Sequence, residues 1–457
     1  PSALALRSAM APDSTPLRQQ MGLAGGALLC GVLLLVPGPE GLDPAGWRTA
    51  AVGVLMAVWW VTEALPISAT ALVPLVLCPL LGITDIEGAA APYANPLIVL
   101  FLGGFLLAQA MQRWRLHRRV ALGIVQGIGT EPRSIIIGFL LASALLSMWV
   151  SNTATALMML PIGLSIIDFV RDQLEARGET MPPHFPLVLL LGIAYACNVG
   201  GMGTLIGTPP NALLAGFFSE TYGVEVGFAQ WMVVGLPLVA VALPLVYLVL
   251  TWVYPIELDR LPGGTRVIDA EWERLGRMTT AEGRVAAVFV LTATLWGTRP
   301  LLADLLPGLS DAGIAVGAGL LLFALPAGTE ARALLVWEDA EELPWGVLLL
   351  FGGGLSLASA ISDTGLAAWI GEGVNALRGG PTLLVVLGAV ALIVGLTEIT
   401  SNTATTAAFL PILGAVAVGF GENPFLFAVP AALGASSAFM LPVATPPNAI
   451  VYGSGLL

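Results

Sequence analysis

The sequence has no lysine, little charge of any kind, and few cysteine or histidine residues. Only 11% of its 457 residues are charged, whereas a soluble domain carries about 25%. Hydrophobic residues make up 57% of the chain, and its mean hydropathy is +0.88. A soluble protein cannot hide that much apolar surface, and a disordered chain is far more polar. The composition therefore predicts an all-α polytopic membrane protein.

The scarce residue types exclude further classes. All 18 basic residues are Arg, and 30 acidic residues leave a net charge of −12, which argues against a nucleic-acid partner. The three Cys lie in apolar stretches and are interpreted as buried hydrophobic residues. His117 and His184 lie near Arg or Pro, in segments interpreted as polar loops. We therefore expect neither a His-based metal site nor an intramembrane hydrolase.

Apolar runs and charged loops divide the chain into segments. Outside the repeats described below, we expect an N-terminal tail over 1–20, scaffold helices over 21–95 and 284–344, and a cytoplasmic loop over 255–283. Within the first scaffold segment, residues 67–82 read as one apolar span.

The Arg residues predict the orientation, because basic loops stay in the cytoplasm. With a cytoplasmic N-terminus, 15 of the 18 Arg fall inside, including the cluster of Arg113, Arg115, Arg118 and Arg119. The segment 112–120 is either an amphipathic interfacial helix or a plain basic loop. We expect a multi-pass protein of the inner (plasma) membrane.

Three motifs recur in the same order in the two halves of the chain. Residues 101–111 resemble 351–361, and Ser151-Asn-Thr-Ala-Thr recurs from Ser401, both at an offset of 250 (401 − 151). Thr208-Pro-Pro-Asn-Ala recurs from Thr445, at an offset of 237 (445 − 208). If each half holds five spans, the halves enter the membrane in opposite orientations. This inverted repeat is typical of secondary transporters.

Each repeat combines an interrupted apolar stretch with a broken helix. The first repeat covers 96–254, with a re-entrant hairpin over 134–168 and a broken helix over 186–218. The second repeat covers 345–457, with a hairpin over 382–418 and a broken helix over 425–451. Irregular backbone is tolerated at membrane depth only where protein or a watery cavity surrounds it.

The Ser-Asn-Thr motifs lie at the centres of the hairpins, where polar residues are costly. Their side chains supply neutral oxygens that suit Na⁺, while amides and hydroxyls can also donate to a carboxylate. The helix that follows each motif adds free N–H groups, which favour an anion. The alternative interpretation is an N-cap with interhelical hydrogen bonds.

The Thr-Pro-Pro-Asn motifs interrupt long apolar helices, because proline cannot donate a backbone hydrogen bond. The break frees carbonyl groups, including those of Gly207 and Ala444, to face a cation. Ser147 and Thr397 each lie four residues before a Ser-Asn-Thr motif, on the same helix face if that arm is helical. A simple proline kink, and hydroxyls bonded to their own helix, are the alternatives.

Two acidic residues, Glu63 and Glu398, lie in apolar surroundings and are either functional or structural groups. No Arg falls within the motifs. An anionic substrate would therefore depend on bound cations and helix termini for positive charge, so that the two would bind cooperatively.

The paired Ser-Asn-Thr and Thr-Pro-Pro-Asn motifs, together with Thr62-Glu-Ala-Leu-Pro66, resemble the divalent anion/sodium symporter family over about residues 20–457. The resemblance implies a homodimer in which a transport domain moves against a scaffold domain by an elevator-type mechanism. It also implies one sodium site in each repeat, and thus at least two Na⁺. Proteins of this family continue into a final spanning helix, so we expect that helix to be missing after Leu457.

The resemblance also implies the residues of each site. The first sodium site would use Ser147, Ser151, Asn152 and the carbonyl of Gly207. The second would use Thr397, Asn402, the carbonyl of Ala444 and the backbone near Ser401. The residues that would hold or flank the substrate carboxylates are Asn152, Thr153, Thr208, Pro209, Ser401, Asn402, Thr403, Thr445 and Pro446.

We therefore predict Na⁺-driven symport of a C4 dicarboxylate such as succinate, malate or fumarate, and no enzymatic activity. A citrate or sulfate symporter, or a Na⁺-independent dicarboxylate exchanger of the same family, remains an alternative. An exchanger would be favoured by a basic residue in place of a sodium ligand, and none lies near the motifs. An anion channel is the alternative from a different class, but it needs no pair of symmetric closed cation sites.

Overall fold

The computed structural model describes residues 17–129, 131–258, 266–328, 332–373 and 381–457. These residues form helices, and the one β contact among them is an isolated bridge between Pro326 and Ala333. Within these ranges, eight helices are long and apolar enough to cross a membrane. The expectation of an all-helical polytopic membrane protein is therefore confirmed.

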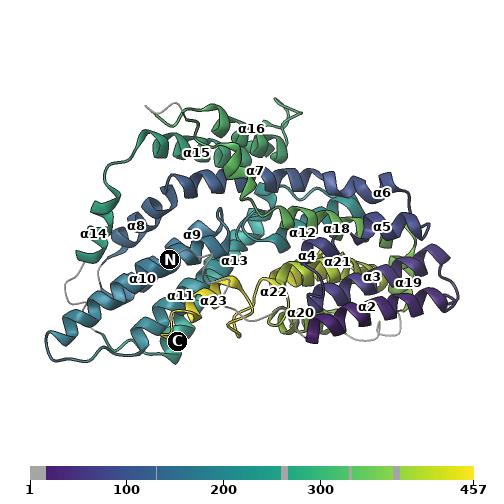
Figure 1. Cartoon of the computed structure of the whole chain (residues 1–457), viewed down its shortest axis with the longest axis horizontal. Coiled ribbons are helices and arrows are strands. Elements are labelled where there is room, and N and C mark those ends of the chain that lie inside the picture. Colours follow the sequence, from purple (N-terminus) through teal and green to yellow (C-terminus); the bar gives the residue numbers. More distant parts are fainter. Residues whose placement is uncertain (1–16, 130, 259–265, 329–331, 374–380) are drawn as a thin grey trace.

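One end of the molecule is built from the N-terminal helices, at the right of Figure 1. They are α2 (Leu17–Leu35), α3 (Pro44–Thr62), α4 (Ile67–Thr70), α5 (Val73–Leu80), α6 (Ile86–Ala90) and the 3₁₀ helix η1 (Ala91–Ala94). The expected apolar span over 67–82 is interrupted between α4 and α5. Pro74 lies in the first turn of α5, and it has no N–H to bond the carbonyl group four residues earlier.

The repeated segments 101–111 and 351–361 lie in long helices, each followed by a shorter one. The first pair is α7 (Pro96–Arg113) and α8 (Leu116–Ile128), and the second is α18 (Trp345–Asp363) and α19 (Leu366–Gly373). The residue before each shorter helix is left-handed, with φ of 56° at Arg115 and 71° at Gly365. The segment 112–120 is therefore the end of α7, a turn and the start of α8, rather than a separate helix or a plain loop.

Both Ser-Asn-Thr motifs join two helices, as predicted. The first helix pair is α9 (Pro132–Ser147) and α10 (Asn152–Glu175), and the second is α20 (Thr382–Thr397) and α21 (Asn402–Phe420). Each Thr-Pro-Pro-Asn motif follows an interruption between two helices. The first break separates α11 (His184–Gly201) from α12 (Pro209–Tyr222), and the second separates α22 (Phe425–Ala435) from α23 (Pro446–Tyr452).

The second halves of the broken helices cross to the opposite repeat. Helix α12 packs against α18, α21 and α22, whereas α23 packs against α10 and α11. Figure 1 shows this exchange, with the yellow α23 beside the teal α11. The two breaks are thereby held together near the middle of the molecule.

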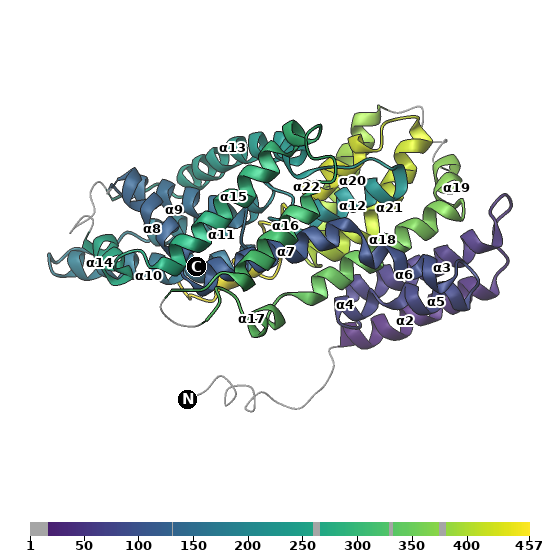
Figure 2. The same ribbon diagram turned by 90° about the horizontal axis from the view of Figure 1, so that it is seen from above.

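The remaining helices connect the parts described above (Figure 2). They are α13 (Phe228–Val253), α14 (Arg266–Leu275), α15 (Thr280–Leu302), α16 (Asp311–Ala324) and α17 (Trp337–Glu341). The expected loop over 255–283 contains α14, and its residues 259–265 lie outside the described part of the chain. His117 and His184 also lie in helices rather than in loops. His184 is the first residue of α11, and His117 is the second residue of α8.

Candidate functional site

The first Ser-Asn-Thr turn places three oxygen atoms in contact. Ser151 is the N-cap of α10, and its hydroxyl oxygen accepts a hydrogen bond from the N–H of Ala154 at 3.3 Å. At the end of α9, Ser147 Oγ lies 2.5 Å from Asn152 Oδ1 and 2.7 Å from the carbonyl oxygen of Cys197. Ser147 is fully buried, so water does not separate these atoms.

The second turn repeats this geometry with different residues. Ser401 caps α21 and accepts a hydrogen bond from the N–H of Ala404 at 3.4 Å. Thr397 Oγ1 lies 2.5 Å from Asn402 Oδ1 and 2.7 Å from the carbonyl oxygen of Ala435. The two capping contacts confirm part of the alternative interpretation of these motifs, because the first residue of each motif does cap a helix.

Each oxygen cluster holds too few protons for its contacts. A hydroxyl group has one proton and can donate it to one acceptor. Ser147 and Thr397 each touch two acceptor oxygens. One of the two contacts in each cluster therefore brings lone pairs together, which a bound cation would relieve. The donor set, made of neutral hydroxyl, amide and carbonyl oxygens, is one that suits a hard monovalent cation.

Gly201 lies so close to the first cluster that no side chain fits at this position. A Cβ atom at this position would lie 2.7 Å from Asn152 Oδ1 and 3.1 Å from the carbonyl oxygen of Gly207. The structure thus brings the predicted ligands Asn152 and Gly207 to one small space, together with Ser147. In the second repeat Ala444 is buried at the matching place, directly before Thr445.

The Asn of each Thr-Pro-Pro-Asn motif holds the unwound segment before it. The side-chain amide of Asn211 donates to the carbonyl oxygens of Gly201 at 3.2 Å and Thr204 at 2.8 Å. Asn448 donates in the same way to Ala438 and Leu441, both at 3.1 Å. These residues, which the sequence did not single out as site residues, fix the carbonyl groups that the breaks expose.

The predicted substrate residues of these motifs begin α12 and α23. Thr208 and Thr445 occupy the N-cap positions, and Pro209 and Pro446 occupy the first helical positions. Proline is favoured there because its missing N–H has no intrahelical partner to lose. Both threonines are buried.

A cross-link between the repeats was not foreseen. Buried Asn198 of α11 donates to Thr445 Oγ1 at 3.1 Å and to Asn448 Oδ1 at 3.4 Å. The signal that could have found it is an amide side chain inside an otherwise apolar helix.

A cavity of about 790 Å³ separates the second turn from the N-terminal helices. Ser401 and Thr403 line it on one side, and residues 63–68 line it on the other. Asn152 and Thr153, the predicted substrate residues of the first turn, are partly exposed but are not among the residues that line this cavity.

The two acidic candidates have different surroundings. Glu63 is exposed, lines the cavity and has a left-handed backbone at the end of α3. Glu398 is 3% exposed and accepts hydrogen bonds from backbone N–H groups within the second break. One Arg also reaches a motif region, because Arg18 donates to the carbonyl oxygens of Val61 and, at 3.5 Å, Ile399. The sequence missed this contact, since Arg18 is far from both motifs in the chain.

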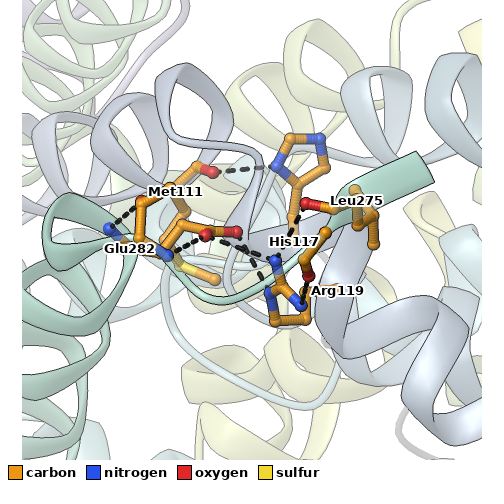
Figure 3. Close-up of polar contacts among 7 residues, drawn as sticks. Met111, His117, Arg119, Leu275 and Glu282 are labelled. Atoms are coloured by element: carbon orange, nitrogen blue, oxygen red, sulfur yellow. Dashed lines mark hydrogen bonds and ion pairs between the residues drawn. The ribbon is translucent and has the colours of Figure 1, made fainter. Parts of the chain in front are cut away.

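A separate charged cluster ties α8 to the connecting segments (Figure 3). Arg119 pairs with buried Glu282 at 3.1 Å and donates to the carbonyl oxygens of Leu275 and Gly276. The ring of His117 makes a 2.9 Å contact with the carbonyl oxygen of Met111. Burial, with a smaller contribution from neighbouring Arg side chains, lowers the pKa of His117 below its usual value of 6.5 although the Met111 contact raises it.

No group of three or more His, Cys, Asp or Glu that could hold a metal occurs among the described residues.

Comparison with known proteins gives a consistent result. Residues 21–457 match the family described as "Sodium:sulfate symporter transmembrane region". The chain is also 46% identical, over 444 residues, to the sodium-dependent dicarboxylate transporter SdcS of Staphylococcus aureus strain USA300. The protein of the same name from strain COL is similar to the same degree. In each case the alignment covers 96% of this chain and 85% of the relative.

Proposed function

Because the chain belongs to the sodium:sulfate symporter family, we propose that it is a secondary active transporter in which Na⁺ drives the uptake of a C4 dicarboxylate. This family is the divalent anion/sodium symporter family that the motifs resemble, so the resemblance is confirmed. The chain is a transporter and not an enzyme. Succinate, malate and fumarate are the proposed substrates.

The observation that carries the proposal is the pair of oxygen clusters at Ser147 and Thr397. In each cluster one hydroxyl group touches two acceptor oxygens. The first proposed sodium site is formed by Ser147, Ser151, Asn152 and the carbonyl of Gly207. The close approach of Asn152 and the Gly207 carbonyl to Gly201 supports this assignment.

The second proposed sodium site is formed by Thr397, Asn402 and the carbonyl of Ala444, with the backbone near Ser401. Thr397 makes the same two oxygen contacts in this site that Ser147 makes in the first.

The substrate would lie between the two turns. Its carboxylates would accept hydrogen bonds from the hydroxyl and amide groups of Asn152, Thr153, Ser401, Asn402 and Thr403. Thr208, Pro209, Thr445 and Pro446 would flank it. The N–H groups at the starts of α10 and α21 favour an anion. Since no basic side chain belongs to either motif, bound Na⁺ would supply most of the positive charge, and the two would bind cooperatively.

The proposed architecture is an inverted repeat with two re-entrant hairpins. The matching turn geometries and the exchanged helices α12 and α23 support it. The scaffold is assigned to 21–95 and 284–344, and the transport domain is built from the hairpins and broken helices. The proposed assembly is a homodimer with an elevator-type motion, as the family resemblance implies.

The proposed orientation places the N-terminus in the cytoplasm and the protein in the plasma membrane. Three segments expected on the cytoplasmic side touch one another, which supports this. Arg118 pairs with Glu271 at 3.3 Å, and the indole N–H of Trp114 donates to the carbonyl oxygen of Leu334 at 2.8 Å. Loops on opposite sides of a bilayer, about 30 Å apart, could not make these contacts.

A sulfate symporter is the second candidate, because the family description names sulfate. Uptake of radiolabelled succinate into proteoliposomes, with and without an inward Na⁺ gradient, tests both proposals. We expect gradient-dependent uptake that unlabelled fumarate or malate suppresses. Suppression by sulfate alone would favour the second candidate, citrate suppression would favour a tricarboxylate carrier, and uptake indifferent to Na⁺ would leave a dicarboxylate exchanger.

A further inference from the structure

Glu398 joins the second turn to the segment that breaks the second helix. It follows Thr397 directly and is 3% exposed. Its two carboxylate oxygens accept hydrogen bonds from the N–H groups of Phe439, Met440 and Leu441, at 2.8–3.1 Å. In the described part of the chain, its hydrogen-bond partners are all backbone N–H groups. The carboxylate therefore fixes three consecutive residues of the unwound segment 436–445.

The first repeat makes the same connection with the parts reversed. The residue that matches Glu398 is Met148, at the offset of 250. Thr204 matches Leu441, because both carbonyl groups accept from the Asn of a Thr-Pro-Pro-Asn motif. In the first repeat, the Thr204 hydroxyl donates to the carbonyl oxygen of Met148 at 2.5 Å. A side chain of the break thus binds the backbone of the turn, whereas in the second repeat a side chain of the turn binds the backbone of the break.

The two connections differ in charge. The first is made by a neutral hydroxyl group, and the second by a carboxylate one residue from a proposed cation ligand. In surroundings of low dielectric constant, the field of such a charge extends over several ångströms. The second cluster therefore has a buried carboxylate beside it that the first lacks, whereas Arg18 reaches the same turn only through a 3.5 Å contact with the carbonyl oxygen of Ile399.

We propose that Glu398 is a positioning residue for the second sodium site, and that its charge makes this site the tighter of the two. This inference rests on the proposed function. The carboxylate holds the segment that carries Ala444 against the turn that carries Thr397 and Asn402. It also supplies a fixed negative charge that the first repeat lacks.

The test measures Na⁺ dependence in Glu398→Gln, which keeps the side-chain volume and removes the charge. In succinate uptake by proteoliposomes, we expect the Na⁺ concentration for half-maximal rate to rise at least about fivefold. The KM for succinate at saturating Na⁺ should change much less. Glu422→Gln is the matched control, because Glu422 accepts from Thr382 at the far end of the same helix pair, and its Na⁺ dependence should equal that of the wild type.

A second variant separates charge from structure. Glu398→Met combined with Leu441→Thr transplants the connection of the first repeat. We expect it to melt at a higher temperature than Glu398→Met alone, yet to keep the weak Na⁺ dependence. The rise in melting temperature with added NaCl, measured on purified protein against choline chloride, gives a readout of Na⁺ binding without transport.

Two results would overturn the inference. One is a folded Glu398→Gln variant with wild-type Na⁺ dependence, and the other is full recovery of Na⁺ affinity in the double variant. Wild-type uptake that ignores Na⁺ would instead remove the proposed function itself, so the two failures are distinguishable.

Discussion

The first arms of the two helix pairs occupy matching positions in the sequence but different surroundings. Helix α9 is buried along most of its length, with Ile135, Ile136 and Phe139 at 1% exposure or less. In α20 only Val386, Ile393 and Thr397 are buried. The reason is the packing, because α8, α11 and α13 surround α9, whereas α20 packs against α21 and α22.

This difference shows what the repeat preserves and what it does not. The turns keep the same two oxygen contacts, at 2.5 and 2.7 Å in both helix pairs. The arms that carry the turns face protein in the first pair and open surface in the second. In a membrane both surroundings are apolar, so both arms can be built mainly of apolar residues. The chemistry of the tips therefore does not depend on how the arms are covered.

The largest expected effect tests the equivalence of the tips. Asn152→Ala and Asn402→Ala should each lower Na⁺-driven succinate uptake at least about 100-fold, since each removes a proposed ligand of both cation and substrate. Uptake into proteoliposomes measures the effect, and size-exclusion chromatography checks that each variant is folded. If one variant retained wild-type uptake, the two tips would not be equivalent.

The next test concerns the arms. Phe139→Ala should lower the free energy of unfolding by about 3–5 kcal/mol, because it leaves a cavity in a closed core. Leu387→Ala should change it by less than about 0.5 kcal/mol, because Leu387 is 53% exposed. Thermal melting in detergent compares the two. Equal losses would mean that α20 is covered by protein in the assembled transporter.

Removal of the central hydroxyl groups should have an intermediate effect. Ser147→Ala and Thr397→Val leave the amide oxygen of the neighbouring Asn without its hydroxyl partner. Sodium binding should weaken by about 1–3 kcal/mol, or roughly 5–150-fold. The Na⁺ titration of uptake measures this loss. If Glu398 strengthens the second site as proposed, the starting affinities differ while the two losses remain similar.

The residues before α8 and α19 allow a smaller test. Both adopt left-handed backbone, which is strained for residues with a Cβ atom. Arg115→Gly should therefore raise the melting temperature or leave it unchanged, whereas Gly365→Ala should cost about 1–2 kcal/mol. Arg115 is exposed, so the loss of its side chain should add little. A clear loss of stability in Arg115→Gly would show that the side chain has another partner.

The smallest expected effect is a pH dependence confined to the first half. The pKa of His117 lies below 6.5 because burial disfavours its charged form, and the matching residue in the second half is Ala367. The contribution of neutral His117 to the stability of the fold is fully present above pH 6.5 and is lost as the pH falls through the lowered pKa. In His117→Gln, the melting temperature of the protein should depend less on pH over that range. An unchanged pH profile would assign the dependence to another group.

Most of the candidate site could be predicted from the sequence. Prolines and polar residues in apolar runs have strong local consequences, so both turns and both breaks lie where the motifs placed them. The same reasoning singles out Ser147 and Thr397, as hydroxyl groups one helical turn before a motif, and the structure places each in contact with the Asn of that motif.

The rest depended on contacts between distant segments. Asn198 meets Thr445 only because α23 crosses into the first repeat, and Arg18 meets Ile399 across the whole chain. The division of 67–82 and the helix within 255–283 were missed because local hydropathy and charge do not determine where a helix ends. The partners of Glu398 were beyond reach, since backbone N–H groups carry no sequence signal.

The exchange of α12 and α23 sets an order of events during biosynthesis. Asn198 and its acceptor Thr445 are 247 residues apart, and a ribosome adding about 5–20 residues per second needs roughly 12–50 s to cover that distance. During this interval α10 and α11 are in the membrane without the helix that completes their contacts. Until α23 is made, the side chain of Asn198 lacks both acceptors that it has in the finished fold, and the first half stays open at that place.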